Sequence, residues 1–165
     1  MKVSKIEQEF IEKVTESQGI VHKISRIYCK DEENRKDLLQ EILIQLWKSY
    51  PTFRGESKFS TWMYRVGLNV AIQYFRKDKR QIKKTELSTE LQNLPELKKE
   101  DTLENEIYML HRAISKLNDI EKAIVMLYLE EKTNEEIAEI IGITQNYVRV
   151  KMNRIKLKLK KILNP

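Results

Sequence analysis

The chain of 165 residues is long enough for one domain or for two small ones. Hydrophobic residues make up 41% of it and charged residues 34%, with four glycines and three prolines, which favours a helical protein over a turn-rich β-sandwich. Lys and Arg outnumber Asp and Glu by 16 to 11 in residues 1–80 and by 7 to 0 in residues 144–165. In residues 81–143 the balance is reversed, with 8 Lys and Arg and 14 Asp and Glu. Two basic segments around an acidic one predict two separate contacts with a polyanion; the alternative is chance clustering of charge.

The sequence carries no signal for a membrane or for secretion. No apolar run approaches the roughly 18 residues that a spanning helix needs, and the N-terminus mixes Lys2, Lys5 and Glu7 with apolar residues, unlike a signal peptide. The single cysteine, Cys29, cannot form an intramolecular disulfide and lies in an apolar-periodic stretch. We interpret it as a core residue, with a reactive thiol as the alternative. We therefore expect a cytoplasmic protein without membrane insertion.

Apolar residues at helical spacing predict a series of helices in the N-terminal half. Residues 5–30 are expected to be helical with a break near Gly19, and residues 31–34 to form a turn. Residues 35–50 form an amphipathic helix, which ends there because the residue before a proline avoids the helical conformation. After a loop, a further helix runs from about residue 59 to 79, with these side chains directed inward: Phe59, Trp62, Met63, Val66, Val70 and Tyr74.

The periodicity stops over residues 82–102, which are polar and contain Pro95, and we interpret them as an extended, solvated linker. Gly142 suits the left-handed conformation at a helix end, and Thr144 is a good N-cap. Periodicity resumes beyond the linker and predicts four helices, at about 107–117, 120–128, 134–141 and 145–162. The sequence thus predicts an all-α protein with two helical domains, 1–81 and 103–165, joined by the flexible linker 82–102.

The segment 133–151 has the spacing of a helix-turn-helix and reads TNEEIAEIIGITQNYVRVK. Ala138 lets two helices approach, Gly142 permits the turn, and three apolar residues seal the pair: Ile143, Val148 and Met152. Thr144 and the first-turn amides of the second helix can hold a phosphate. The side chains on this helix that suit base edges in the major groove are Gln145, Asn146, Tyr147, Arg149, Val150, Asn153 and Arg154. Phosphate charge would come from Lys156, Lys158, Lys160 and Lys161.

The alternative for this segment is an ordinary helical hairpin with a lysine-rich, solvated tail. Against it stands the absence of any acidic residue after position 143, because a helix that is merely soluble usually intersperses Glu among its lysines.

Aromatic residues gather in the N-terminal half, where six of the chain's 13 fall between positions 53 and 75, followed by a basic cluster at 76–80. Helical phase places Arg65, Asn69, Ile72 and Arg76 on a face beside the core. Rings on which bases stack, combined with cations that follow a backbone, suit a site for unpaired strands. The alternative is that the aromatics are core residues; we expect that for Phe59 and Trp62 and leave both interpretations open for Tyr64, Asn69 and Arg76.

These segments resemble the extracytoplasmic-function (ECF) group of bacterial RNA polymerase sigma factors. The stretch 37–47, DLLQEILIQLW, is similar to the family's region 2.2, and the stretch 53–66, FRGESKFSTWMYRV, is similar to region 2.3. Residues 110–160 look like region 4, and the resemblance covers nearly the whole chain in the family's order. It implies a minimal factor with regions 2 and 4, without region 1.1 or region 3. Tyr147 is bulkier than the small residue expected at its position, which leaves the −35 sequence open.

The resemblance also implies a surface for each partner. The β′ clamp helices of core polymerase would meet Asp37, Gln40, Glu41, Ile44 and Trp47. The loop with Phe53, Arg54 and Lys58 would capture a flipped −10 base, and the opened non-template strand would follow Tyr64, Arg65, Asn69, Ile72, Tyr74 and Arg76. Region 4 would meet the β flap and read the −35 major groove, chiefly with Arg149, Val150, Asn153 and Arg154. Residues 82–102 would thread toward the active-site channel, and a separate anti-sigma factor would regulate the chain.

Other functional classes fit the sequence less well. It has no Walker loop, no His-Glu-x-x-His motif and no Cys/His cluster, and its two histidines, His22 and His111, have no metal-binding partner at helical spacing. We therefore expect no enzyme, no metal and no cofactor. A stand-alone helix-turn-helix regulator is the closer alternative, but it would leave residues 31–80 without a role. A protein–protein adaptor would explain neither basic segment.

Overall fold

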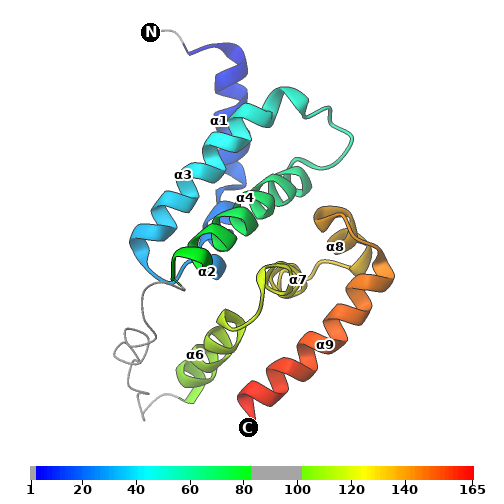
Figure 1. Ribbon diagram of the computed structural model, residues 1–165. Coiled ribbons are helices and arrows are strands. Elements are labelled where there is room, and N and C mark those ends of the chain that lie inside the picture. Colours follow the sequence, from blue (N-terminus) through cyan, green and yellow to red (C-terminus); the bar gives the residue numbers. More distant parts are fainter. Residues whose placement is uncertain (1–2, 83–101) are drawn as a thin grey trace.

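The computed structural model describes residues 3–82 and 102–165. The regular elements within those ranges are all helices (Figure 1): α1 (Lys5–Glu16), α2 (Gln18–Tyr28), α3 (Glu32–Ser49), the 3₁₀ turn η1 (Tyr50–Thr52), α4 (Phe59–Ile82), α6 (Thr102–Ser115), α7 (Asp119–Leu129), α8 (Asn134–Ile141) and α9 (Gln145–Leu163). The predicted all-α fold with two helical domains is confirmed. Apart from its end residues, the predicted linker 82–102 lies outside the described residues, and the exact domain boundaries stay a prediction.

Several helix boundaries differ from the sequence prediction: α6 begins at Thr102, five residues before the predicted start, and α4 continues to Ile82, three residues beyond the predicted end. The break predicted near Gly19 lies at Ser17, whose backbone angles of φ −115° and ψ 19° are not helical and whose N–H donates to the Val14 oxygen at 3.1 Å. Residues 32–34 are helical rather than a turn. The Asp31 carboxylate accepts a hydrogen bond from the backbone N–H of Asn34 at 3.1 Å, so Asp31 caps α3 and starts it three residues earlier than predicted.

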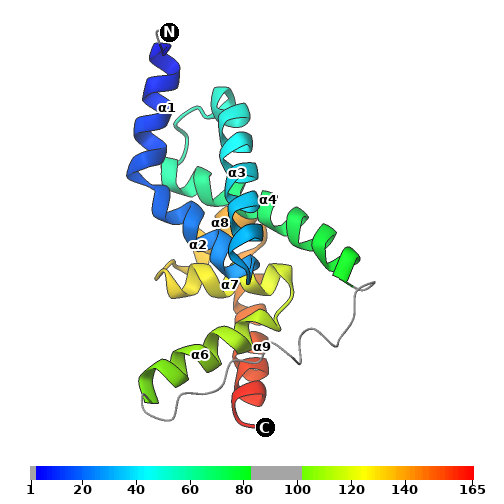
Figure 2. The ribbon, with the colours of Figure 1, turned by 90° about the vertical axis from the view of Figure 1, so that its left-hand side faces the viewer.

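The N-terminal unit is built from α2, α3 and α4, which pack against one another over one core, with α1 at its edge (Figure 2). Ile24, Ile42 and Leu68, one from each helix, are almost fully buried there. Gly67 lets α4 approach α2 closely, because a Cβ atom at this position would lie 2.8 Å from Cδ1 of Ile24. Because this packing buries one face of α3 and one face of α4, it leaves the opposite face of each helix for other contacts.

The C-terminal unit holds the predicted helix-turn-helix. Gly142 ends α8 with φ of +83°, the left-handed conformation in which glycine carries no Cβ penalty. The Thr144 hydroxyl accepts a hydrogen bond from the N–H of Tyr147 at 3.1 Å and caps α9. Val148 is completely buried against α8, as the sequence pattern predicted. The helix α9 therefore has a fixed inner face and an outer face directed away from the rest of the protein.

The two units lie against each other, and α7 is at their junction. Seven consecutive residues of α7, 121–127, are buried, because α7 packs on α2 and α4 on one side and on α8 and α9 on the other. The views in Figures 1 and 2 agree on this central position. Within 3–82 and 102–165, no helix is long and apolar enough to cross a membrane, and no cluster of His, Cys, Asp and Glu could hold a metal ion.

Candidate nucleic-acid and polymerase interfaces

The outer face of α3 combines acidic, amide and apolar side chains in the open. Ile44 is 53% exposed and Trp47 38% exposed, on a helix whose opposite face buries Leu38, Ile42 and Leu46 completely. The predicted polymerase-binding residues Asp37, Gln40 and Glu41 are exposed beside them. Large apolar residues exposed together are typical of a surface that a partner covers. The packing thus brings all five predicted residues onto one accessible stripe.

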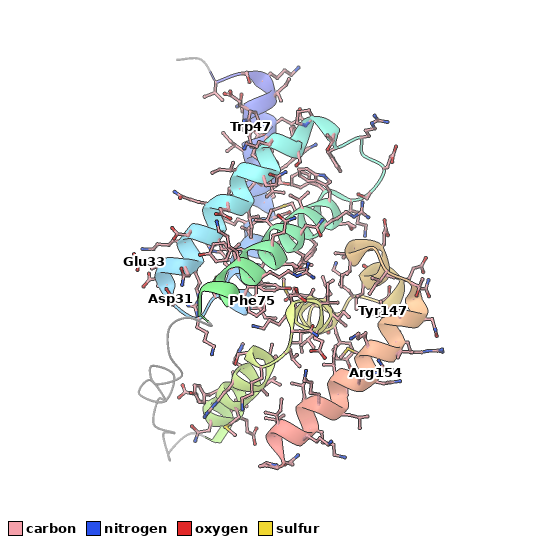
Figure 3. The ribbon with its side chains drawn as sticks, in the orientation of Figure 1. Asp31, Glu33, Trp47, Phe75, Tyr147 and Arg154 are labelled. Carbon is pink, nitrogen blue, oxygen red and sulfur yellow. The ribbon has the colours of Figure 1, made fainter. Side chains whose placement is uncertain are left out.

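Trp47 also has a structural role. Its ring lies 5.0 Å from that of Phe10 in α1, in a tilted arrangement that is favourable for aromatic pairs. One face of the Trp47 ring therefore holds α1 against α3, and the other face is open to solvent. Figure 3 labels Trp47 near the C-terminal end of α3.

The predicted base-capturing loop is seated on an aromatic cluster. Phe53 is half-buried, with ring centroids 5.5 Å from Phe59 and 5.3 Å from Trp62, whereas Arg54 and Lys58 are exposed. The Nζ atom of Lys13 in α1 lies 5.6 Å from the centre of the Phe53 ring, within cation–π range. Sequence reasoning missed Lys13. A basic residue on α1 gives no local signal that it will reach a loop 40 positions further along the chain.

The predicted strand-binding face of α4 is directed toward the C-terminal unit. Arg65, Asn69 and Arg76 remain exposed in part, whereas Ile72 is buried at 9% exposure and Tyr64 at 3%. A pocket of about 230 Å³ opens between α4, α7 and α8, and its lining is Leu68, Asn69, Ile72, Gln73, Arg76, Ile120, Ile140 and Ile141. Helical phase alone therefore placed four of the predicted residues correctly on one face: Arg65, Asn69, Ile72 and Arg76.

Tyr64 and Tyr74 occupy different surroundings from this face. Burial, followed by the nearby charge of Glu130, raises the pKa of Tyr64 to about 12. The ammonium group of Lys132 lies 5.7 Å from the centre of the Tyr64 ring. The Tyr74 hydroxyl donates a hydrogen bond to the side-chain oxygen of Asn34 at 3.1 Å, so this ring lies against α3. Tyr74 is thus directed inward, as its helical phase predicted.

The predicted duplex-reading residues lie together at the start of α9. The N-cap Thr144 is exposed. So are the seven residues on the helix itself: Gln145, Asn146, Tyr147, Arg149, Val150, Asn153 and Arg154. Nη2 of Arg149 donates to the side-chain oxygen of Asn146 at 2.6 Å, which orders both side chains on the free surface. Figure 3 shows Tyr147 and Arg154 on α9, on a different side of the molecule from Trp47.

Comparisons with known proteins agree with these two units. Residues 14–81 match the Sigma-70 region 2 family and residues 107–159 match the Sigma-70 region 4 family. The chain is 31% identical over 135 residues to RNA polymerase sigma factor YlaC of Bacillus subtilis, which covers 78% of this chain and 77% of that protein. It is 30% identical over 142 residues to the ECF RNA polymerase sigma-E factor of Haemophilus influenzae, which covers 78% and 74% respectively.

The chain belongs to the ECF sigma factors. Two solved structures share its fold over both units. The sigma factor RpoE of Bartonella quintana, in complex with the anti-sigma factor NepR, has a TM-score of 0.70 and 16% identity, covering 94% of this chain and 97% of RpoE. CnrH, in complex with the cytosolic domain of CnrY, has a TM-score of 0.67 and 17% identity, covering 95% and 88%. The N-terminal unit is region 2 of this sigma factor and the C-terminal unit is region 4.

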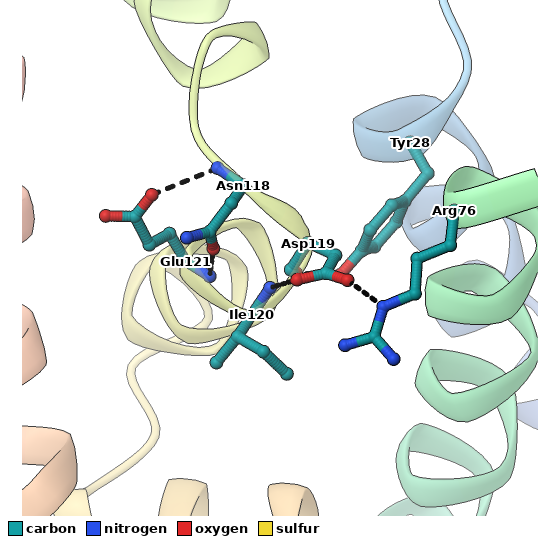
Figure 4. Close-up of polar contacts among 6 residues, drawn as sticks. All are labelled: Tyr28, Arg76, Asn118, Asp119, Ile120 and Glu121. Carbon is teal, nitrogen blue, oxygen red and sulfur yellow. Dashed lines mark hydrogen bonds and ion pairs between the residues drawn. The ribbon is translucent and has the colours of Figure 1, made fainter. Parts of the chain in front are cut away.

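One cation of region 4 has a partner that the sequence did not suggest. Lys158 donates to the Glu121 carboxylate at 3.0 Å while its side chain stays 48% exposed, and its predicted contact with a phosphate stays a prediction. Glu121 also closes the capping box of α7 with Asn118 (Figure 4). Burial by itself would raise the pKa of Glu121, but the N–H of Asn118 and the Lys158 ammonium outweigh it and hold that pKa below 4.5.

Proposed function

We propose that region 2 of this sigma factor binds the β′ clamp helices of core RNA polymerase through the exposed stripe of α3. The observation that supports this assignment is the exposure of Ile44 and Trp47 beside the acidic Asp37 and Glu41. An acidic rim steers a basic partner and sets its register, and the apolar centre supplies binding energy once water is excluded.

For the −10 element, the proposed contact runs along α4. From Lys58, which directly precedes α4, to Arg76 the chain rises about 27 Å at 1.5 Å per residue, so cations lie at both ends of the proposed face. The loop at one end would take a base out of the stack, and the cations Arg65 and Arg76 would follow the backbone of the opened strand. This proposal needs region 4 to move away from α4, because Tyr64 and Ile72 are covered in the structure.

Binding energy, and no bond chemistry, would open the DNA. Each base that stacks on a ring contributes about 1–3 kcal/mol, and flipping a base out of the duplex costs a few kcal/mol. A small number of captured bases therefore balances the cost once polymerase holds the duplex in place. A factor with few such contacts should depend on a promoter that matches it well.

For the −35 element, the proposed reader is the first half of α9. Arg149, Asn153 and Arg154 project from the part of a recognition helix that enters the major groove. The second half of α9, with Lys160 and Lys161, would follow phosphates and add affinity without sequence information. Region 4 would also meet the β flap of polymerase.

The proposed setting is the bacterial cytoplasm, with an anti-sigma factor as the regulator. The fold that this chain shares with RpoE, which was solved in complex with the anti-sigma factor NepR, supports that partner. A stand-alone regulator is not favoured, because the chain matches both the region 2 and the region 4 families.

Run-off transcription with purified core polymerase on a library of genomic promoter fragments tests the proposal. We expect specific initiation by the native chain and its loss in Asp37→Arg. The matched control is Glu32→Arg, the same charge reversal on α3 but about 140° further round the helix, which should retain initiation. Failure of the native chain to bind core, together with tight binding to duplex DNA alone, would refute the sigma assignment of these surfaces.

A further inference from the structure

The loop 53–58, to which we assign base capture, is attached to the rest of region 2 at its two ends. At the far end, the oxygen of Lys58 accepts a hydrogen bond from the N–H of Trp62 at 3.1 Å. Among the residues that the structure describes, the backbone groups of 54–57 form no hydrogen bond with other backbone groups. At the near end the attachment includes the side chain of Phe53, so the position of this ring decides where the rest of the loop begins.

The ring of Phe53 packs among three other rings. Its centroid lies 5.5 Å from that of Phe59 and 5.3 Å from that of Trp62, and it is stacked on the Tyr50 ring at 6.5 Å. Aromatic pairs at these distances are favourable beyond the area that they bury. Phe53 is nevertheless only half-buried, so part of its ring remains open for an unpaired base to stack on.

A cation from α1 joins this group of rings. Nζ of Lys13 lies 5.6 Å from the centre of the Phe53 ring. It lies 5.7 Å from the centres of the Tyr50 and Phe59 rings. These three rings come from η1, from the loop and from the first residue of α4, so a single ammonium group reaches each element that meets at the loop. A cation within about 6 Å of a ring centre is attracted by the quadrupole of the ring.

Lys13 has a defined position, because both its side chain and its helix are held. Its Nζ atom pairs with the Glu9 carboxylate at 3.2 Å, with Glu four residues before Lys, which is the favourable order on a helix. Lys13 is also the chief reason why the pKa of the Glu9 carboxyl lies below its ordinary value. Phe10 and Val14 are buried and fix α1 on region 2. Lys13 precedes the residues 14–81 that match Sigma-70 region 2, so that match assigns it no role.

We propose that Lys13 is a positioning residue for the capture of the −10 base. Its ammonium group fixes the Phe53 ring, and with it the loop 53–58, in the conformation that receives the base. The proposal rests on the function assigned to this loop above. Lys13 acts through the ring and does not touch DNA itself. A ring that is already fixed loses little conformational freedom when the base arrives, whereas without the cation the ring and the loop must be ordered at that moment, which weakens binding.

An abasic scan tests this with core polymerase carrying the full-length chain. The DNA is a forked promoter fragment identified by run-off transcription, and each base of its −10 non-template strand is removed in turn. Lys13→Met keeps the aliphatic stem and removes the charge. It should weaken binding to the intact fragment by about two- to fivefold, the effect of one cation–π contact at a partly exposed site. This loss should disappear on the fragment that lacks the captured base, because the positioned ring then has nothing to receive.

Two further variants serve as controls. Lys13→Arg keeps a cation that can reach the rings and pair with Glu9, so it should bind every fragment as the native chain does. Lys5→Met, the same change at an exposed lysine of α1, should leave binding unchanged. A purely structural role of Lys13 would weaken binding of Lys13→Met to all fragments equally. A direct phosphate contact would do the same and would also reduce the salt dependence by about one ion. Either result, or native binding by Lys13→Met, would overturn the proposal.

The same scan separates this proposal from the function on which it rests. Polymerase with the native chain should lose more affinity when the captured base is removed than when any neighbouring base is removed. If no position stands out in this way, base capture by the loop fails as an assignment. If one position stands out equally for the native chain and for Lys13→Met, the loop captures a base without help from Lys13, and only the positioning role is refuted.

Discussion

Ile42 and Ile44 lie two residues apart on α3, and their replacement by alanine is predicted to affect two different properties, stability for Ile42 and polymerase binding for Ile44. Ile42 is completely buried in the core of region 2, and Ile44 is 53% exposed on the stripe proposed for polymerase. Ile42→Ala should lower the free energy of unfolding by about 2–5 kcal/mol, through lost burial and a residual cavity. Ile44→Ala should change it by no more than about 0.5 kcal/mol, as exposed substitutions usually do.

The effect of Ile44→Ala should appear in polymerase binding. Full burial of an isoleucine side chain contributes about 1.5–3 kcal/mol. Roughly half of this surface is still open in the free chain, so its burial by the clamp contributes about 0.8–1.5 kcal/mol. That corresponds to an affinity loss of about four- to twelvefold, since 1.4 kcal/mol is a factor of ten.

Urea unfolding followed by circular dichroism gives the first quantity, and titration of labelled sigma factor with core polymerase gives the second. The reasoning would be refuted if Ile44→Ala unfolded as readily as Ile42→Ala, or if it bound core polymerase with native affinity. The first result would mean that Ile44 is part of the core of region 2, and the second that the exposed stripe of α3 does not lie in the interface.

Three further predictions concern region 4. Gly142→Ala should destabilise the chain by about 1 kcal/mol in urea unfolding, because φ is +83°, whereas the helical control Gly19→Ala should not destabilise it. Glu121→Gln should lower the free energy of unfolding most near neutral pH. The ionised Glu121 stabilises the native chain above pH 4.5, and this contribution is lost as pH falls through the lowered pKa of the group. The free energies of unfolding of the two proteins should therefore converge in acid. On duplex promoter DNA, Arg149→Ala should relax base discrimination, whereas Lys160→Ala should weaken binding to all sequences and reduce the salt dependence by about one ion.

The helix-turn-helix is the part of this protein that local sequence predicted best. The bounds of α8, the left-handed Gly142 and the cap by Thr144 are all as expected. Each depends on residues within a few positions of one another, so periodicity and capping chemistry suffice to predict them. The early start of α3 also has a local cause, the Asp31 cap, which the prediction overlooked in favour of a turn.

The candidate site on region 2 was predictable only in part. Helical phase placed Arg65, Asn69, Ile72 and Arg76 on one face, and the sequence motifs indicated the exposed stripe of α3. Nothing in the sequence indicated that Lys13 would reach the loop at Phe53. The roles of these residues in binding DNA and polymerase stay predictions until the variants are measured.

The sequence by itself determined the helices, the two regions and the family, because these follow from short-range periodicity, capping and motif order. Tertiary structure alone decided that Tyr64 is covered and that Arg76 pairs with Asp119, a residue 43 positions away. Such pairings depend on how two finished helical surfaces fit together in shape and charge. No local pattern encodes that fit, because each helix would form with the same period whether its outer face met solvent, DNA or the other half of the chain.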